Sequence, residues 1–383
     1  MAIDQKARYA YILEYYDSQA EMIRRYQLLY FLADDTIEMH DIKNRRIFLK
    51  RCQYDGIKLS DFFVGSIVNI YSRNLTVVEY ADEFTRSANV KNHQRTLAMI
   101  KPDAFKNAGS IISAINNAGF RIANMKVFSL SRTEAEEFYS VHRNREFFDG
   151  LVDFMQQKPI MALELVKSNA ILDWRAFMGP TNSNTARQNA PKSIRARYGT
   201  DGRMNAVHGS DSAENAIKEI NFFFGTGHKF TSTAQFSDSA SSCCLIKPHA
   251  FKENITGEIL QEILNNKNFA IGALQLFSLS KENAADMLEV YKGVISEYVA
   301  MVDELSSGPL IAIEIIAKGT DKQHGVNQFR DFVGPFDPQI AKILRPNTLR
   351  AKFGINKIRN AIHCTDLPED GNLEVEYFFH LLQ

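Results

Sequence analysis

The sequence predicts an α/β protein in which one domain occurs twice, preceded by a small antiparallel β module. The repeat is the first observation: Met99–Lys106 returns as Leu245–Lys252, and Asn205–His208 returns as Asn360–His363. The second is that each copy alternates between strand-like and helix-like apolar spacing. The third is that the region before both copies consists mainly of strand-like segments. A repeat of this length indicates two copies of one folding unit.

The N-terminal region, residues 1–91, is expected to form an antiparallel meander. Short apolar segments are separated by polar turn residues every few positions, which is typical of hairpin-connected strands. This region contains no nucleophile, paired carboxylates or glycine-rich loop, so we interpret it as a docking module rather than an active site. The expected strands are Tyr26–Leu32, Ile37–His40, Arg46–Lys50, Ser66–Tyr71 and Leu75–Tyr80.

The first copy, residues 95–225, has the pattern β-α-β-α-β-α-β, which favours a four-stranded sheet of ferredoxin-like topology. The helix after the second strand is expected to begin at Thr133, with Glu136 completing a capping box. Residues 226–241, rich in Ser, Thr, Gly and Ala, are expected to be a linker, and residues 242–383 form the second copy. The expected elements of the first copy are strands at Thr96–Ile100, Arg121–Leu130 and Ile160–Val166 and helices at Ser110–Ala118 and Ser212–Ile220.

Composition limits the classes of function. The 383 residues include 45 basic and 45 acidic side chains, so no global charge favours nucleic acid or an anionic membrane. Four irregularly placed cysteines suggest a reducing compartment. No signal segment and no run of 18 apolar residues is present, so we expect a cytosolic protein without membrane association.

The strongest candidate for chemistry is His208, at the end of a short strand and before Gly209 and two hydroxyl residues. Glu219 follows on the next helix, where it could hold one imidazole nitrogen and leave the other free as a nucleophile. The alternative is a buried structural histidine. Three repeated cations, Lys101, Arg175 and Arg195, suit a polyphosphate and favour the nucleophile.

These motifs resemble nucleoside diphosphate kinases. The family's Lys-Pro-Asp is Lys101–Asp103, and its Asn-x-x-His-Gly-Ser-Asp-Ser is Asn205–Ser212. The resemblance implies that His208 carries the γ-phosphate and that Glu219 orients it, with Mg²⁺ held mainly by the phosphates of ATP or another nucleoside triphosphate. It also implies nucleotide contacts: Lys101, Tyr139, Arg195 and Asn205 on the transferring phosphate or ribose, Arg175 and Thr181 on the β-phosphate, Phe147 on the base and Leu151 behind it.

The second copy keeps much of this set but departs from the family's pattern. Phe336 stands where the threonine is expected, His249 replaces the aspartate, and Cys364-Thr365 replaces Gly-Ser after the histidine. Tyr298 takes the stacking position. We therefore favour a degenerate copy kept for structure, although its histidine could still be phosphorylated. The matching residues are Lys247, Tyr291, Arg330, Arg350, Asn360, His363 and Glu374.

The N-terminal region resembles the DM-type module of ciliary proteins, through Arg24–Asp34, Glu38–Asp41 and Arg46–Arg51. A member of the kinase family with this module and two kinase copies implies a place in the cytoskeleton: the axoneme of cilia or flagella, inside doublet microtubules, and the centrosome or basal body. The implied partners are tubulin, other axonemal proteins and the γ-tubulin ring complex. Basic residues near the hairpins could face acidic tubulin.

Two classes of function follow from the sequence. The first is an enzyme that transfers a γ-phosphate from a nucleoside triphosphate to a diphosphate through His208. The second is a scaffold of microtubules in which the kinase folds supply bulk and surface. We expect both roles together, with catalysis confined to the first copy. A third possibility is a protein kinase that relays phosphate from His208 to a protein side chain.

Overall fold

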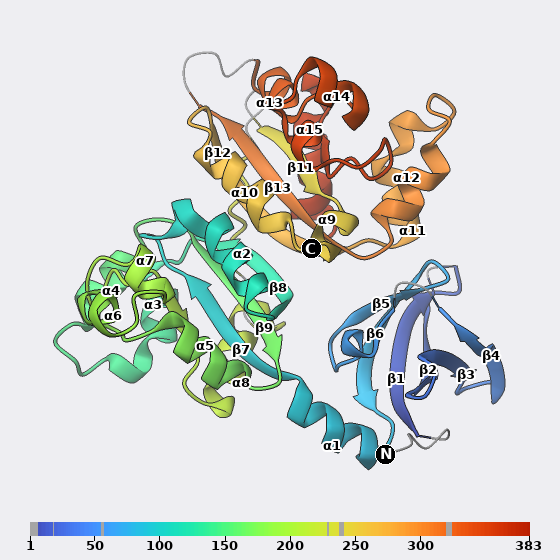
Figure 1. The fold of residues 1–383 in the computed structure, drawn as a ribbon, viewed down its shortest axis with the longest axis horizontal. Coiled ribbons are helices and arrows are strands. Elements are labelled where there is room, and N and C mark those ends of the chain that lie inside the picture. Colours follow the sequence, from blue (N-terminus) through green and yellow to red (C-terminus); the bar gives the residue numbers. More distant parts are fainter. Residues whose placement is uncertain (1–6, 18, 55–56, 228–229, 237–240, 319–323) are drawn as a thin grey trace. The chain divides into compact units, whose positions relative to one another are not determined.

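The computed structural model describes residues 7–17, 19–54, 57–227, 230–236, 241–318 and 324–383. The chain divides into two compact units (Figure 1). The first contains residues 1–93 and 278–308, and the second contains residues 94–277 and 309–383. Within the described ranges, every helix is too short or too polar to cross a lipid bilayer.

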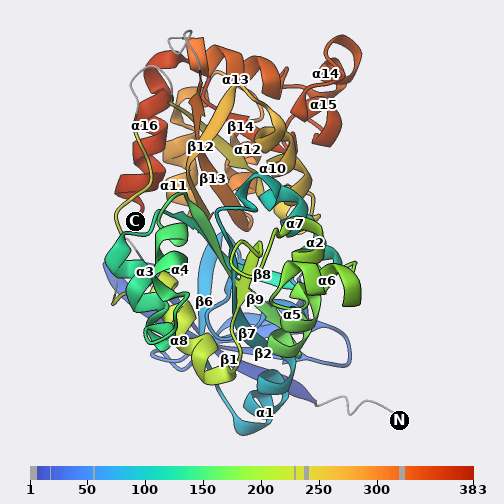
Figure 2. The ribbon, with the colours of Figure 1, turned by 90° about the vertical axis from the view of Figure 1, so that its left-hand side faces the viewer.

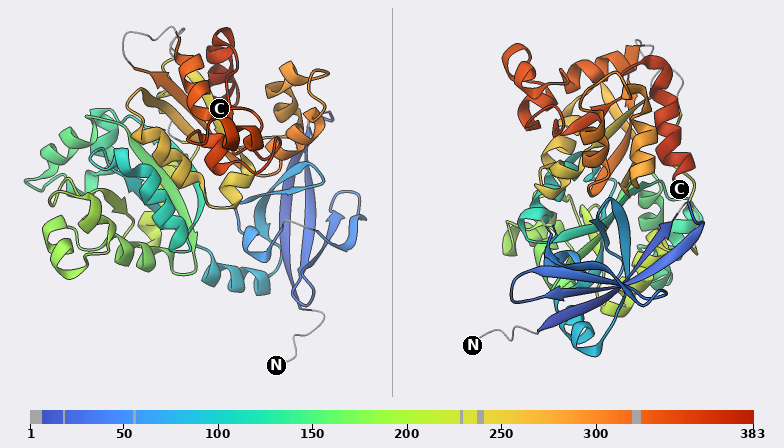
Figure 3. Two further views of the ribbon diagram at one scale, coloured as in Figure 1. Left: turned by 45° about the horizontal axis from the view of Figure 1, so that its top comes forward. Right: turned by 90° about the vertical axis from the view of Figure 1, so that its right-hand side faces the viewer.

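The first unit is built on a six-stranded antiparallel sheet in the order β4-β3-β2-β1-β6-β5, drawn in blue in Figure 3. The predicted antiparallel module is therefore confirmed, and β1 is an additional strand that the sequence reading did not predict. The strands are β1 Arg8–Asp17, β2 Met22–Phe31, β3 Thr36–Asp41, β4 Arg46–Gln53, β5 Ile67–Ile70 and β6 Arg73–Tyr80.

A helix is attached to strand β1 of this sheet by hydrogen bonds. Helix α1, Glu83–Asn92, is capped by Asp82, whose carboxylate accepts the N–H of Thr85 at 2.7 Å. The Thr85 hydroxyl accepts the N–H of Ala10 in β1 at 2.8 Å, and Asn89 donates to the Tyr11 hydroxyl at 3.2 Å. The unit also holds helices α11, Lys281–Met287, and α12, Tyr298–Leu305.

The second unit begins with the first copy, whose four strands lie in the order β10-β7-β9-β8 with antiparallel pairing. This order is the ferredoxin-like topology that the sequence predicts. The strands are β7 Gln94–Ile100, β8 Arg121–Phe128, β9 Ile160–Lys167 and β10 Val207–Gly209; the helices are α2 Ala108–Asn117, α3 Arg132–Phe138, α4 Phe148–Met155, α5 Ala170–Met178, α6 Ser183–Asn189, α7 Ile194–Tyr198 and α8 Ala213–Phe224.

Strand β7 shows why the sheet has helices on both faces. Ala98 and Ile100 belong to the apolar cluster that contains residues of α2 and α5. Leu97 and Met99 point to the opposite face, into the cluster with α3, α4 and α8. Side chains alternate between faces along a strand, so a continuous apolar strand requires cover on both sides. Figure 2 shows these two sets of helices on either side of β7 and β9.

The predicted start of α3 is wrong. Ser131, not Thr133, is the N-cap: its hydroxyl accepts the N–H of Glu134 and the Glu134 carboxylate accepts the N–H of Ser131. The earlier start places Arg132 inside the first turn. From there its guanidinium bonds to Glu136 at 2.8 Å and to Asp153 of α4 at 2.7 Å.

The second copy repeats this topology, in the order β12-β13-β11-β14. Its strands are β11 Ser241–Ile246, β12 Phe269–Ser278, β13 Pro309–Ala317 and β14 Ile362–Cys364; its helices within the second unit are α9 Pro248–Lys252, α10 Thr256–Asn265, α13 Gly325–Val333, α14 Pro338–Leu344, α15 Leu349–Phe353 and α16 Gly371–Glu376.

The two copies join within the second unit. Strand β8 pairs with β12 at Lys126 and Gln275, so eight strands form one sheet. Helix α2 packs on α10, where the amide N–H and hydroxyl of Ser110 both donate to the Gln261 side-chain oxygen, at 2.8 and 3.0 Å. Each copy therefore covers an open edge of the other's sheet.

The segment predicted to be a linker, residues 226–241, contacts both copies through some of its described residues, and its last residue, Ser241, already belongs to β11. Phe230 stacks on Phe223 of α8 with ring centroids 5.7 Å apart. Further along, the buried carboxylate of Glu314 accepts the backbone N–H groups of Gln235 at 2.8 Å and Phe236 at 2.9 Å. Residues 228–229 and 237–240 lie outside the described ranges, as do residues 1–6 of the N-terminal module.

Candidate active site

The centre of the first-copy site is a histidine and a carboxylate from neighbouring elements. His208 lies on β10, and its Nε2 is 3.1 Å from Oε1 of Glu219 on α8. The other carboxylate oxygen accepts the Ser210 hydroxyl at 2.7 Å, which fixes the carboxylate. Among the described residues, Nδ1 of His208 has no hydrogen-bond partner. A proton on Nε2 would leave the Nδ1 lone pair available as a nucleophile.

The backbone before this histidine is strained. Ala206 has φ of 68°, a left-handed conformation that is unfavourable for a residue with a Cβ. The Asp103 carboxylate stabilises it by accepting the Ala206 N–H at 3.0 Å. Burial raises the pKa of Asp103 above its ordinary value. Strain held in this way is common at functional sites, where the surrounding contacts enforce it.

A buried cation, Lys101, and a half-buried one, Arg195, lie beside the histidine. Nζ of Lys101 donates to Oδ1 of Asn205 at 2.8 Å, and burial followed by the nearby Arg195 lowers the lysine pKa to about 8. Arg195 donates to the carbonyls of Gly179 at 2.9 Å and Val207 at 3.2 Å. Burial, then the charge of Arg175, lowers its pKa to about 10. Each of these two side chains has a positively charged neighbour that lowers its pKa. A bound polyanion would offset the repulsion between the charges.

Aromatic side chains line the same region. The ring of Tyr139 lies edge-on to the His208 imidazole at 6.1 Å, and Phe138 lies edge-on to it at 5.2 Å. The Tyr139 hydroxyl is buried and has no partner among the described residues. Burial raises the pKa of this phenol well above its ordinary value, so it stays a neutral donor. Phe147, just before α4, is 50% exposed, whereas Leu151 one turn later is buried.

The remaining nucleotide-binding candidates lie after β9, in α5 and in the loop that follows it. Arg175 is exposed on α5. Thr181 precedes α6 with its side chain exposed, and its carbonyl accepts the side-chain amide of Asn205 at 2.9 Å. Asn205 therefore links Thr181 to Lys101, and the structure brings together residues that are far apart in the sequence.

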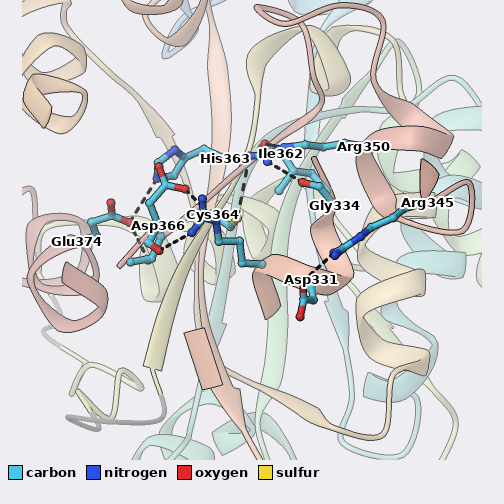
Figure 4. A network of polar contacts seen from close by, with 11 residues as sticks. Asp331, Gly334, Arg345, Arg350, Ile362, His363, Cys364, Asp366 and Glu374 are labelled. Carbon is cyan, nitrogen blue, oxygen red and sulfur yellow. Dashed lines mark hydrogen bonds and ion pairs between the residues drawn. The ribbon is translucent and has the colours of Figure 1, made fainter. Parts of the chain in front are cut away.

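The second copy keeps the central pair (Figure 4). Nε2 of His363 is 3.3 Å from Oε2 of Glu374, and Thr365 replaces Ser210 by donating its hydroxyl to the same carboxylate at 2.8 Å. Arg350 donates to the carbonyls of Gly334 at 2.9 Å and Ile362 at 3.0 Å. The side chain of His363 is only 5% exposed, compared with 22% for His208. The framework is kept while access to the imidazole is reduced.

Other second-copy contacts differ from those of the first. The guanidinium of Arg330 pairs with the Asp366 carboxylate at 3.3 Å. The ring of Phe336 lies 5.9 Å from the Arg350 guanidinium. Oδ1 of Asn360 is buried without a partner within the described structure, whereas Oδ1 of Asn205 accepts from Lys101; Lys247 keeps the bond to the loop carbonyl, at Ile358, at 3.0 Å. Tyr291 ends a short 3₁₀ helix, Glu289–Tyr291, that belongs to the first unit.

Sequence reasoning assigned no role to several residues of the site. Asp103 and Ser210 stood in the two motifs that resemble the kinase family, Lys101–Asp103 and Asn205–Ser212, and that resemblance was the signal that could have identified them. Trp174, the single tryptophan, is fully buried and donates from its indole nitrogen to the His208 carbonyl at 3.2 Å. A Cβ on Gly209 would lie 2.3 Å from this indole, so glycine is required there.

Comparison with known proteins agrees with this arrangement. The family model "Nucleoside diphosphate kinase" matches residues 94–228 and 240–383, and "Nucleoside diphosphate kinase 7 N-terminal PH domain" matches residues 3–91. The chain is 47% identical over 381 residues to nucleoside diphosphate kinase homolog 7 of Rattus norvegicus and 46% identical to that of Mus musculus. Each alignment covers 99% of this chain and 94% of the relative.

Single-domain relatives match one copy. The nucleoside diphosphate kinase of Chlamydia abortus is 50% identical over 133 residues, covering 34% of this chain and 92% of the relative. The solved structure of the Aquifex aeolicus enzyme is 44% identical, with a TM-score of 0.35, and covers 36% of this chain and 99% of that one. With two kinase domains behind an N-terminal PH domain, the chain belongs to the nucleoside diphosphate kinase family.

Proposed function

We propose that the first copy transfers the γ-phosphate of a nucleoside triphosphate to a nucleoside diphosphate through a phosphohistidine at His208. The observation that carries this proposal is the imidazole itself: Nε2 is held by Glu219, and Nδ1 is open beside the cations of the site. A nucleophile held by a carboxylate and surrounded by phosphate-binding groups suits phosphoryl transfer.

The reaction proceeds in two balanced halves. The Nδ1 lone pair attacks the γ-phosphorus, an N–P bond forms, and the bond to the β,γ-bridging oxygen breaks, so the diphosphate leaves with those electrons. A terminal oxygen of a second nucleoside diphosphate then attacks the phosphorus; an O–P bond forms, the N–P bond breaks, and its electrons return to Nδ1. In both steps the Glu219 carboxylate accepts a hydrogen bond from the Nε2–H group and stabilises the positive charge on the imidazole ring.

The other residues position the nucleotide. Lys101, Arg195 and the Tyr139 hydroxyl are donors for the transferring phosphate, and Asn205 holds the lysine in place. Arg175 and Thr181, both exposed, are the proposed contacts of the β-phosphate. Phe147 offers an exposed ring to the base, and Leu151, buried one turn later in α4, is the residue proposed to lie behind it.

The site suits a magnesium ion that is bound mainly by the phosphates of the nucleotide. Within the described ranges, no group of three His, Cys, Asp or Glu side chains could hold a metal ion. Mg²⁺ commonly binds through substrate phosphates with one or two carboxylates. Asp211, which interacts electrostatically with Arg175 and His142 and accepts a hydrogen bond from Asn215 at 2.7 Å, would offer its other carboxylate oxygen to the ion. Bound magnesium would neutralise charge on the β- and γ-phosphates.

The second copy is proposed to be catalytically silent. His363 is almost fully buried, and Arg330 is already paired with Asp366 rather than available to phosphate. Phe336 places a ring beside Arg350 in place of the Thr181 hydroxyl.

Labelling with γ-labelled ATP tests both assignments. Wild type should acquire acid-labile label that moves to added GDP, because phosphohistidine is the intermediate. His208→Gln should abolish the label, and His363→Gln, the matched change in the second copy, should leave it unchanged. Label that persists in His208→Gln would contradict the first assignment. Label lost in His363→Gln would contradict the second. Transfer to protein rather than to GDP would favour the protein kinase alternative.

We also propose that the N-terminal module docks on an acidic surface of doublet microtubules in the cytoskeleton of cilia. The hairpin of β3 and β4 supports this role. Lys43, Arg45, Arg46 and Lys50 are exposed there, and none forms an ion pair with another described residue. By contrast, Arg24, Arg25 and Arg51 are paired with Asp17, Glu14 and Asp34. The four unpaired cations are the ones available to an acidic partner.

Co-sedimentation with microtubules tests the docking proposal. Reversing two charges, with Lys43→Glu and Arg45→Glu together, should reduce the bound fraction, and the reduction should be larger at low salt because exposed charges are screened by ions. Lys158→Glu, an exposed lysine of the first copy, is the control and should bind as wild type does. Equal binding by all three proteins would exclude this hairpin as the contact.

A further inference from the structure

Arg203 lies in the loop between α7 and β10, next to the first-copy site. The Asp201 carboxylate holds this loop by accepting the N–H groups of Arg203 at 2.7 Å and Met204 at 2.8 Å. The carbonyl of Arg203 in turn accepts a hydrogen bond from Nζ of Lys101 at 3.3 Å. The backbone of this residue is therefore part of the support for the lysine.

The side chain of Arg203 points to a different element. Its Nη1 donates to the Gly150 carbonyl in α4 at 3.2 Å. A Cβ at Gly150 would lie 2.7 Å from Nη1, so the glycine leaves room for the guanidinium. Gly150 is three residues after Phe147, and residues at this spacing share a helix face. The guanidinium thus lies within one turn of the exposed ring proposed to stack on the base.

The second copy shows that the loop does not need this side chain. There Asn356 accepts the N–H groups of Ile358 at 3.0 Å and Arg359 at 2.8 Å. The Ile358 carbonyl accepts from Nζ of Lys247 at 3.0 Å, as Arg203 does for Lys101. Ile358 occupies the position of Arg203 with the same backbone contacts. At this position the first copy has a guanidinium and the second copy does not, so support of the loop does not explain the arginine side chain.

We propose that Arg203 is a nucleobase-binding residue that, with Phe147, encloses the base and favours purine nucleoside diphosphates over pyrimidine ones. This inference rests on the proposed function of the site. A guanidinium is planar, permanently charged and weakly hydrated, and it stacks on π-systems. Purines offer it a larger π-face than pyrimidines do. One hydrogen bond to Gly150 orients the group while its other donors stay available.

The test compares Arg203→Ile, which installs the second-copy residue, with Arg203→Lys and wild type. For Arg203→Ile, KM for GDP should rise about five-fold, the size of one exposed cation–π contact. KM for CDP should change much less, and kcat should stay the same for both. Arg203→Lys should resemble the isoleucine variant, because a lysine lacks the planar group. Arg197→Ile, which removes an exposed arginine from α7, should leave all values unchanged.

The outcomes separate this role from a structural one. If Arg203 only tied the loop to α4, its loss would disturb Lys101 and reduce kcat for GDP and CDP alike, and that result would overturn the proposal. An unchanged ratio of KM values would overturn it as well. Phosphorylation of His208 by ATP, measured separately, reports on the proposed function. If wild type is not phosphorylated, calorimetric titration of GDP and CDP into wild type and Arg203→Ile still decides the role of Arg203.

Discussion

At the scale of single residues, the site depends on placing positive charge where water is largely excluded. Lys101 is 6% exposed and is surrounded by groups that do not fully compensate its charge. Burial, and then Arg195, brings its pKa to about 8. In the free enzyme this buried charge is therefore unfavourable, and a bound phosphate stabilises it.

This depressed pKa predicts a pH dependence. Below about pH 8 the lysine is charged and binds phosphate; above it the neutral amine cannot, so kcat/KM for the nucleoside triphosphate, which binds the unphosphorylated enzyme, should fall as pH rises through about 8. The profile of kcat should fall at higher pH, because bound phosphate raises the lysine pKa.

Steady-state kinetics from about pH 6 to pH 10 measure both profiles. Lys101→Arg is the control: it carries a group that stays charged over this range, so its kcat/KM should not show the same decline. A wild-type profile that stays level to pH 10 would contradict the role of Lys101.

At the scale of elements, strongly periodic segments could be predicted from the sequence, whereas segments held by polar contacts could not. The five strands predicted for the N-terminal module are all present. Strand β1 was missed because Ala10 and Tyr11 are buried side by side, so its pattern does not alternate. Helix α1 was missed because Thr85 and Asn89 attach it to β1 by hydrogen bonds rather than by an apolar stripe.

The start of α3 shows a second limit. Ser131 to Glu134 and Thr133 to Glu136 both have the spacing of a capping box, and local sequence alone does not choose between them. Tertiary contacts decide, because only the earlier start places Arg132 against Asp153 of α4. In the site, sequence could name His208 and Glu219, but not the positive φ of Ala206 or the reach of Arg203 to Gly150, which depend on distant elements.

At the scale of the whole molecule, the two copies differ by compensated exchanges on one framework. Gly209 is required in the first copy because the Trp174 indole fills the space above it. In the second copy the corresponding positions are Cys364 and Phe329, both buried. A smaller ring opposite a larger residue conserves volume, as tightly packed cores demand. Cys364 therefore fills the space that the smaller ring leaves. Burial raises the pKa of its thiol to about 11, so it is not a reactive thiolate.

The junction of the copies gives the last prediction. Gly109 of α2 meets α10 so closely that a Cβ would lie 2.3 Å from the backbone nitrogen of Gln261 and 2.4 Å from the Gly257 carbonyl oxygen. In an isolated helix, alanine is favoured over glycine by about 1 kcal/mol. Here Gly109→Ala should instead lower the free energy of unfolding, by about 1–3 kcal/mol, because backbone atoms must move apart.

Chemical denaturation measures this change, with Gly227→Ala as the control because a Cβ there meets nothing within 4 Å. The control should unfold at the wild-type midpoint or slightly above it, and Gly109→Ala should unfold earlier. A Gly109→Ala protein as stable as the control would mean that α2 and α10 do not hold each other in solution. An earlier midpoint would mean that the second copy, even without catalysis, stabilises the first through this contact.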